Sequence, residues 1–296
     1  MKTEKNYNLV FVYGTLLRGE RANSFLDEAE FAGDAVLRDF AMYDLGCYPG
    51  IVGRKGEAVL GELYYVDDAT LKHLDEYEGE GSLYRRTTVL VNTSDGEEAT
   101  ALAYIYAHSV EGKPLVRSRW NMKDYDPVWY AAYGSNLSTE RFEYYILGGV
   151  CPINGKPYTG CTDKTRWSQS LVRTVPGSMY FANKSSSWER KGVAFYAPDC
   201  AGETIMRFYM ITFGQLKDIQ EQEGGWYRRM AFVDFVGGVP AFTLTSECLQ
   251  DENAPGDKYF NLIFDALTKD CGIHGQEIQE YLKTCRTPLG IRETKK

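Results

Sequence analysis

The sequence has few of the residues that most often build metal centres and covalent active sites. Its 296 residues include only three histidines, His73, His108 and His274, which lie far apart. The seven cysteines are odd in number and include no Cys-x-x-Cys pair. We therefore expect no zinc site, no disulfide framework and no Ser-His-Asp triad, and we expect reduced cysteines in a cytoplasmic protein.

The sequence also lacks an excess of positive charge and a long apolar run. The formal net charge is -8, which argues against nucleic acid or an anionic membrane as the main partner. No apolar run reaches the roughly 18 residues of a membrane span, and the N-terminus shows no signal-peptide pattern. Hydrophobic residues make up 44% of the chain, enough for ordinary cores, and its length predicts two domains.

What the sequence does contain is an internal repeat. Three motifs recur in the same order: Val10–Leu16 as Tyr130–Leu137, Leu74–Gly79 as Ile219–Gly224, and Tyr84–Arg86 as Tyr227–Arg229. The middle motifs are offset by 145 residues (223 − 78) and the Tyr-Gly motifs by 120 (133 − 13), so the second copy holds 25 extra residues between them. We predict one domain at residues 1–118 and a second at 127–296 with a helical C-terminal tail.

Each copy carries a glutamate at the end of a predicted helix. In the helix expected at 68–78, Leu71, Leu74 and Glu78 stand at i, i+3 and i+7, which is one helical face. Asp67 can cap its start, and Gly79 suits a left-handed residue after its end. The neighbouring acids, Asp75, Glu76 and Glu221, fall on other faces, where we expect them to be solvated.

The second copy repeats this geometry with different residues. A capping box of Thr212 and Gln215 precedes Leu216, Ile219 and Glu223, and Gly224 ends the helix. A carboxylate on an apolar face is costly unless it is paired or lies in a wet cleft, and burial raises its pKa as a general acid/base requires. The alternative is a structural ion pair, with Arg85 or Arg228 as the partner.

The Tyr-Gly segments come at the ends of predicted strands. Glycine lets the backbone approach a ligand closely, and consecutive N–H groups beside the hydroxyl of Thr15 or Ser135 can hold a carboxylate. The alternative is an ordinary turn between a strand and a loop.

These motifs together resemble the γ-glutamylcyclotransferase superfamily. Residues 7–109 resemble its γ-glutamylamine cyclotransferase, or AIG2-like, branch in Val12–Leu16 with Gly19, Met42–Gly50, Gly61–Tyr64, Leu74–Gly79 and Tyr84–Arg86. The second half resembles another branch in Ala132–Leu137, Gly192–Phe195 and Gln222–Gly225. The resemblance implies an α+β fold, two tandem small mixed β-barrels with flanking helices. The pattern of the first half agrees, with strands expected near 8–13, 57–66, 85–91 and 99–107.

The resemblance also implies an activity and its residues. The enzyme would cyclise a small-molecule γ-glutamyl amine or amide to 5-oxoproline and release the amine, without a metal or cofactor. In the first site Glu78 would be the acid/base, with Tyr13, Gly14, Thr15 and Leu16 binding the substrate. In the second site Glu223 would serve with Tyr133, Gly134, Ser135 and Asn136. A tyrosine on the last strand, Tyr104 or Tyr106, completes the first site only.

Three alternatives stay open at this point. The chain could be a non-catalytic module that binds a γ-glutamyl group or another carboxylate, or a regulatory module, with a degenerate second domain. It could also be an enzyme acting on another amide or ester, or a scaffold with one active half. The leaving amine is also open, with lysine, a polyamine, an aminoglycoside chain and cysteinylglycine among the candidates. We expect the first half to be the better catalyst. Trp226 either narrows the second pocket, recognises a larger and flatter leaving group, or simply packs.

Overall fold

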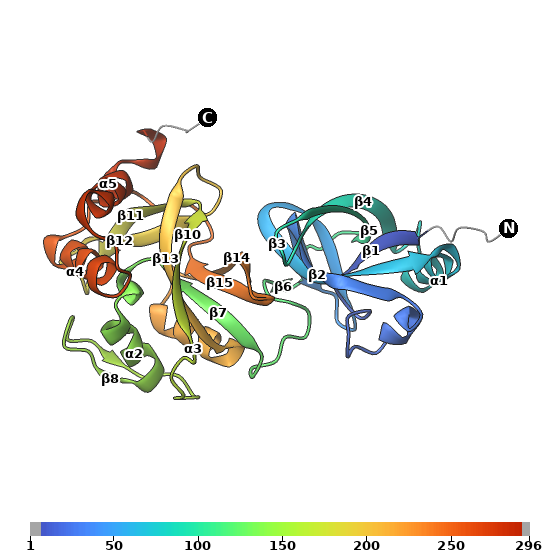
Figure 1. The fold of residues 1–296 in the computed structure, drawn as a ribbon, viewed down its shortest axis with the longest axis horizontal. Helices are drawn as coiled ribbons and strands as arrows, with labels where there is room; N and C mark the ends of the chain where they lie inside the picture. Colours follow the sequence, from blue (N-terminus) through green and yellow to red (C-terminus); the bar gives the residue numbers. More distant parts are fainter. Residues whose placement is uncertain (1–6, 292–296) are drawn as a thin grey trace. The chain divides into compact units, whose positions relative to one another are not determined.

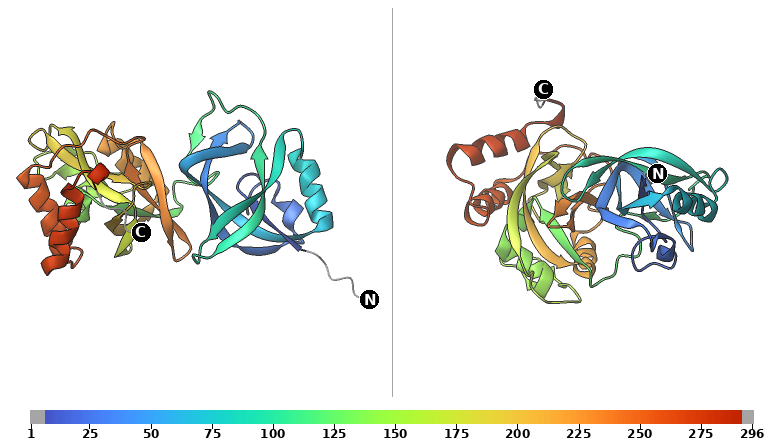
Figure 2. Two further views of the ribbon diagram at one scale, coloured as in Figure 1. Left: turned by 90° about the horizontal axis from the view of Figure 1, so that it is seen from above. Right: turned by 45° about the vertical axis from the view of Figure 1, so that its right-hand side comes forward.

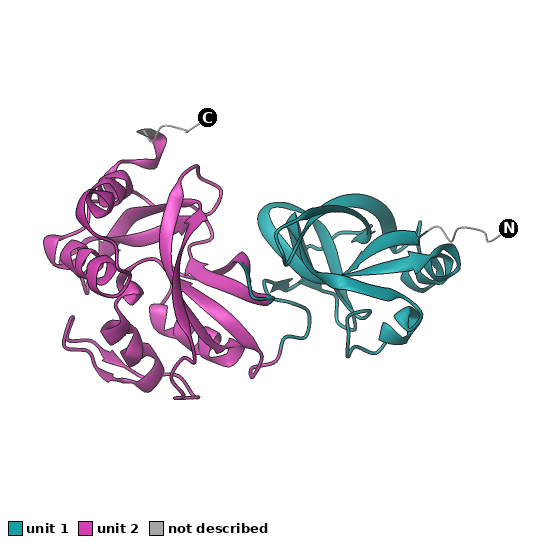
Figure 3. Ribbon diagram, in the orientation of Figure 1, with its two compact units in different colours: residues 1–122, 235–238 teal, residues 123–234, 239–296 magenta. Residues whose placement is uncertain are grey.

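The computed structural model describes residues 7–291, which form two compact units (Figure 3). Unit 1 runs to Met122 and also includes Phe235–Gly238, and unit 2 comprises Lys123–Asp234 and the chain from Val239 onward. The division falls in the segment where the apolar pattern of the sequence is interrupted. No helix among the described residues is long and apolar enough to cross a membrane.

Unit 1 is a closed five-stranded barrel with one α-helix (Figure 1). Its elements are β1 (Tyr7–Val12), η1 (Asn23–Leu26), β2 (Glu30–Asp44), β3 (Pro49–Asp67), α1 (Asp68–Glu78), β4 (Tyr84–Thr93), β5 (Glu98–Tyr106) and β6 (Leu115–Val116). The strand order is β3-β1-β5-β4-β2, and β2 pairs again with β3 to close the ring, while the short β6 pairs with β2. The α+β class expected from the sequence is confirmed.

The long strand β2 is the element that sequence reasoning missed. Its pairing with β3 shifts register between Phe31 and Gly33 and again between Arg38 and Phe40. At the second shift Asp39 has a φ of 62°. At the first shift β2 has one residue more than β3, and at the second β3 has three residues more than β2 (58 − 53 against 40 − 38), so no single alternation of inward-facing residues runs through the pair. The same bulges bend β2 enough to reach β3 and β4 and close the barrel.

Helix α1 begins and ends as its sequence predicts. The Asp67 carboxylate accepts a hydrogen bond from the N–H of Thr70 (2.9 Å), and Gly79 adopts the left-handed conformation with φ 65° and ψ 47°. Leu71 and Leu74 are buried in the barrel core. The face that carries them also carries Glu78, which is therefore directed toward the interior of unit 1 at the last turn of the helix.

Unit 2 is built around an open five-stranded sheet. Its strands are β7 (Pro127–Ala132), β8 (Gly149–Val150), β9 (Pro157–Tyr158), β10 (Ser170–Pro176), β11 (Ser178–Ser185), β12 (Lys191–Ala197), β13 (Glu203–Thr212), β14 (Arg229–Val236) and β15 (Val239–Thr245). Its helices are η2 (Ser135–Leu137), α2 (Thr139–Leu147), α3 (Phe213–Glu223), α4 (Asp257–Lys269), α5 (Gly275–Arg286) and η3 (Leu289–Ile291). The sheet order is β10-β13-β7-β15-β14, and β11–β12 and β8–β9 form separate pairs. The C-terminal tail expected near 260–282 consists of two packed helices, α4 and α5 (Figure 2).

The second sheet differs from the closed barrel that the sequence led us to expect. In the described part of the chain its edge strands, β10 and β14, do not pair with each other. An ion pair between Arg173 and Asp234 (3.8 Å) links them instead. The reason is length, because β10 has seven residues, whereas β2 at the corresponding place in unit 1 has 15 and reaches both neighbours.

Around the Tyr-Gly segment the two units nevertheless pair their strands in the same register. Val10 of β1 lies opposite Tyr64 of β3, and Tyr130 of β7 lies opposite Tyr209 of β13. Tyr130 follows Val10 by 120 residues (130 − 10) and Tyr209 follows Tyr64 by 145 (209 − 64), which are the offsets that align the two halves of the sequence. In each unit a helix with the glutamate at its last position follows directly, α1 in unit 1 and α3 in unit 2.

Candidate functional site

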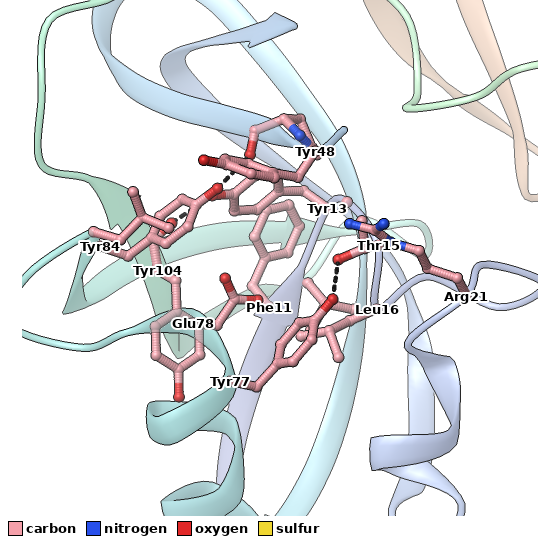
Figure 4. Close-up of a pocket in the computed structure, with 14 residues that line it drawn as sticks. Phe11, Tyr13, Thr15, Leu16, Arg21, Tyr48, Tyr77, Glu78, Tyr84 and Tyr104 are labelled. Carbon is pink, nitrogen blue, oxygen red and sulfur yellow. Dashed lines mark hydrogen bonds between the residues drawn. The ribbon is translucent and has the colours of Figure 1, made fainter. Parts of the chain in front are cut away.

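A cavity of about 200 Å³ lies in unit 1 where β1 ends (Figure 4). The residues that line it are Phe11, Val12, Tyr13, Gly14, Thr15, Leu16, Arg21, Tyr48, Pro49, Tyr77, Glu78, Leu83, Tyr84 and Tyr104. All five residues that the sequence predicts for the first site, from the Tyr-Gly loop and the end of α1, are among them. The cavity therefore brings together segments that are more than 60 residues apart in the chain.

The loop after β1 requires its glycine. A Cβ atom on Gly14 would stand 2.6 Å from Cγ of Pro49, closer than real contacts allow. The Tyr13 hydroxyl donates to the carbonyl of Tyr104 (2.6 Å), which fixes the start of the loop against β5. Within residues 7–291 the backbone N–H groups of Thr15 and Leu16 donate no hydrogen bond. Two amides at the cavity are thus available to an anion.

Glu78 lies half-buried in the wall of the same cavity. Burial raises the pKa of its carboxyl to about 7, because the charged form loses hydration that nothing in the protein replaces. The side chain makes no hydrogen bond or ion pair with any described residue, and Arg85, the suggested structural partner, is exposed. A carboxyl with this pKa can both accept and return a proton near neutral pH.

Asp75 corrects one expectation from the sequence. It is not simply solvated, because its carboxylate forms an ion pair with Arg86 and accepts a hydrogen bond from the Tyr104 hydroxyl (2.9 Å). Tyr104 lines the cavity with its ring but directs its hydroxyl to Asp75, whereas Tyr106 is not part of the lining. Glu76, by contrast, is exposed as expected.

Sequence reasoning missed several residues of the cavity wall. Tyr77 hydrogen-bonds through its hydroxyl with that of Thr15 (3.1 Å), and the Tyr84 hydroxyl donates to the carbonyl of Pro49 (2.6 Å). Arg21 donates to the carbonyl of Cys47 (3.1 Å). A signal for Arg21 was present in the repeat, since an arginine follows the loop glycine by seven residues in both halves (21 − 14 and 141 − 134).

Unit 2 has a corresponding cavity of only about 30 Å³. It is lined by Tyr130, Tyr133, Gly134, Ser135, Asn136, Ala194, Glu223, Tyr227, Leu244 and Tyr259. All five residues that the sequence predicts for the second site are present. The Tyr133 hydroxyl donates to the carbonyl of Leu244 (2.8 Å), as Tyr13 does to Tyr104 in unit 1.

The protein's own side chains fill this second cavity. Asn136 donates to the Glu223 carboxylate (2.8 Å). Tyr259, from α4, accepts the N–H of Ala194, and its hydroxyl lies 3.2 Å from where a Cβ on Gly134 would stand. Trp226, the residue suspected of narrowing the site, does not line it and is 40% exposed. The C-terminal tail, which has no counterpart in unit 1, is therefore what restricts the space.

The environment of Glu223 also differs from that of Glu78. Burial raises the pKa of Glu223, but the charge of Arg141 and a hydrogen bond from Tyr145 act in the opposite direction. Arg141 is itself buried, with its guanidinium 5.4–5.6 Å from the ring centres of Tyr145, Tyr158 and Trp188. Glu223 thus has internal partners that Glu78 lacks.

Nothing in the described part of the chain groups three His, Cys, Asp or Glu side chains in a way that could hold a metal ion. Three of the seven cysteines, Cys151, Cys161 and Cys285, are buried. The chemistry that the cavity itself offers therefore comes from one carboxyl, loop amides, tyrosine hydroxyls and one guanidinium.

Comparison with known proteins finds relatives of the first half of the chain. Residues 10–123 match the family model described as gamma-glutamyl cyclotransferase, AIG2-like. The chain is 43% identical over 112 residues to a γ-glutamylcyclotransferase-family protein of Vibrio cholerae, a match covering 38% of this chain and 92% of the relative. It is 36% identical over 109 residues to the γ-glutamylcyclotransferase family protein YtfP of Escherichia coli, covering 37% and 91% respectively.

Two solved structures are also similar. YkqA from Bacillus subtilis matches 96% of this chain and 100% of its own, with 20% identity and a TM-score of 0.43. An AIG2-like protein from Mus musculus matches 38% of this chain and 88% of its own, with 30% identity and a TM-score of 0.36.

Proposed function

Because the chain belongs to the γ-glutamylcyclotransferase family, we propose that unit 1 cyclises a γ-glutamyl amine or amide to 5-oxoproline and releases the amine. The observation that carries this proposal is the state of Glu78. Its carboxyl has a pKa of about 7, has no partner among the described residues and shares a cavity with the unpaired amides of the Tyr13–Leu16 loop. A buried carboxyl kept without a partner costs stability, and such a cost is typical of a catalytic group.

Substrate binding is assigned to the loop. The amides of Thr15 and Leu16 would donate to the α-carboxylate of the γ-glutamyl group, and the Thr15 hydroxyl, already oriented by Tyr77, lies beside them. Both reacting groups belong to one molecule. A substrate bound in a folded conformation therefore has its α-amine next to its own γ-carbonyl. Orientation of this kind can supply up to ~7–11 kcal/mol of the barrier in well-aligned cases.

Glu78 would then carry a proton from the α-nitrogen to the leaving nitrogen. Its carboxylate takes a proton from the α-ammonium, and the freed amine attacks the γ-carbonyl carbon to form the ring C–N bond. The tetrahedral intermediate collapses when the bond to the leaving nitrogen breaks and Glu78 returns that proton to the leaving nitrogen. The ring nitrogen gives up its second proton to the released amine, which leaves neutral lactam and an ammonium product. A pKa near the working pH suits both transfers, and such catalysis contributes roughly 10²–10⁴-fold.

The test is release of 5-oxoproline by the purified full-length protein across a panel of γ-glutamyl amines. Glu78→Gln should lower kcat by about 10² or more while the protein stays folded. The matched control is Glu76→Gln, which changes an exposed carboxyl on the same helix and should leave kcat unchanged. Wild-type kcat in the Glu78→Gln variant would show that this carboxyl is not the acid/base.

For unit 2 we propose a diverged second copy of the domain, at residues 127–296, that does not carry the main activity. The support is the shared strand register, the smaller cavity and the internal partners of Glu223. A non-catalytic binding or regulatory role suits a cavity of about 30 Å³ better than turnover does, since the cavity of unit 1 is about 200 Å³.

A further inference from the structure

Arg86 of β4 holds the end of α1 on both sides of Glu78. Its guanidinium forms an ion pair with the carboxylate of Asp75, three residues before Glu78. Its backbone N–H donates to the carboxylate of Glu80, two residues after Glu78. The turn between these two anchored residues is the one in which Gly79 is left-handed and Glu78 reaches the cavity wall. The place of the Glu78 carboxyl therefore depends on a strand as well as on its own helix.

The carboxylate of Asp75 also connects this helix end to the substrate loop. Arg86 and Tyr104 lie directly opposite each other on β4 and β5, and the Tyr104 hydroxyl donates to the second oxygen of Asp75 (2.9 Å). Figure 4 shows the ring of Tyr104 beside Glu78, with its hydroxyl directed toward α1. The carbonyl of Tyr104 accepts the hydroxyl of Tyr13 (2.6 Å), where the loop begins. One series of bonds thus joins the helix of the proposed acid/base to the loop that would bind the substrate.

In unit 2 the position of Asp75 is taken by Gln220 (75 + 145). Its side-chain amide donates to the backbone carbonyls of Tyr227 and Arg228 (3.1 and 3.0 Å), just before β14. A neutral amide forms no ion pair, so α3 has a neutral contact with the backbone where α1 has a charged contact with an arginine and a bond from a tyrosine hydroxyl.

The other two partners also differ in unit 2. Leu244, whose carbonyl accepts the loop tyrosine as that of Tyr104 does, has no hydroxyl to donate to a helix. Arg229, the counterpart of Arg86 in the repeat, forms an ion pair with Asp199 (4.0 Å), which lies between β12 and β13. The contacts that link helix, strands and loop in unit 1 are thus replaced in the unit to which we assign no main activity.

We infer that three residues position the proposed acid/base against the substrate loop, namely Asp75, Arg86 and Tyr104. The inference rests on the function proposed above and adds the residues that align the proton-transfer group. The side chains of Arg86 and Asp75 are 31% and 26% exposed, so water screens their attraction and the pair contributes little to stability. Its loss should therefore impair catalysis more than folding, because a displacement of about 1 Å at a reacting group can cost roughly 100-fold in rate.

The experiment removes each contact separately in the full-length protein. Asp75→Asn and Arg86→Gln each abolish the ion pair, and Tyr104→Phe deletes one hydroxyl while keeping the ring in the cavity wall. With a γ-glutamyl amine that the wild type converts, each variant should lower kcat roughly 10- to 100-fold and leave KM within about threefold. The matched control is Arg85→Gln, which changes the exposed neighbouring arginine and should leave both constants unchanged.

Two further readouts separate positioning from a merely structural role. The double variant Asp75→Asn with Arg86→Gln should be no slower than the slower single variant, because both changes break the same contact. Both single variants should also move the acid limb of the pH profile of kcat/KM to lower pH, since a looser helix end hydrates Glu78 and lowers its pKa. A direct effect of charge would instead shift the two variants in opposite directions, because one loses a negative charge and the other a positive charge.

Several results would overturn the inference. Wild-type kcat in all three variants would show that the contacts do not align Glu78, and losses confined to KM would assign them to substrate binding. Opposite shifts of the acid limb would replace positioning by a charge effect. A rate that falls only in proportion to the folded fraction, measured by urea unfolding, would leave a structural role alone. If the wild type releases 5-oxoproline from no substrate, the proposed function itself fails, and this inference with it.

Discussion

The raised pKa of Glu78 predicts that the catalytic carboxyl destabilises the protein at high pH. Its folded-state pKa is about 7 against an ordinary value of 4.5, so the folded protein holds the proton more tightly than the unfolded chain. Stability is then unaffected below pH 4.5 and falls as the pH rises toward 7. At 1.36 kcal/mol for each pKa unit, the difference of 7 − 4.5 lowers the free energy of unfolding by about 3 kcal/mol at pH 8. This value is an upper bound because the side chain is only half-buried.

Glu78→Gln removes this cost because glutamine does not ionise. The variant that loses turnover should therefore be more stable than the wild type. Its advantage in the free energy of unfolding should grow by about 2–3 kcal/mol from pH 5 to pH 8. The assay is urea unfolding of the full chain at a series of pH values, followed through the transition of unit 1. Glu76→Gln, on the exposed side of the same helix, should run parallel to the wild type. If Glu78→Gln also runs parallel, its carboxyl is not desolvated and the proton-transfer role loses its physical basis.

Three further outcomes follow from the structure. Gly14→Ala places a Cβ 2.6 Å from the ring of Pro49, so it should displace the loop and lower kcat/KM at least about tenfold; wild-type kinetics would show that the loop does not bind substrate. Glu223→Gln should keep most of the 5-oxoproline release, whereas a loss as large as that of Glu78→Gln would show that unit 2 is an equal catalyst. Glu62 is fully buried between two arginines in unit 1, so Glu62→Gln should lower the free energy of unfolding by about 3–5 kcal/mol. A loss below about 1 kcal/mol would mean that the ion pairs of Glu62 are not needed for the fold.

The local structure of the site was predictable because it depends on neighbours in the chain. The cap of Asp67, the left-handed Gly79 and the placement of Glu78 on the face of Leu71 and Leu74 all follow from helical periodicity and hydrogen bonds spanning three or four residues. The offsets between the two halves likewise match the strand register. Register determines which residues of a strand face inward, so aligned positions of the two halves face the same way.

Where the prediction was wrong or incomplete, contacts distant in sequence decided the outcome. Asp75 has the pattern of a solvated residue, yet β4 and β5 bring Arg86 and Tyr104 to it. One source of the difference between the two cavities is Tyr259, which lies more than 120 residues after the loop it covers and belongs to a helix with no counterpart in the first half.

By itself, the sequence determined the family, the α+β class and the positions of the two glutamates, since these depend on motifs and on short-range periodicity. Only the tertiary structure decided which glutamate stands without a partner in an open cavity and which is surrounded. The reason is that burial and the pairing of charges depend on every segment packed against a group, and Arg21, Tyr77 and Tyr259 reach the two sites only through the fold.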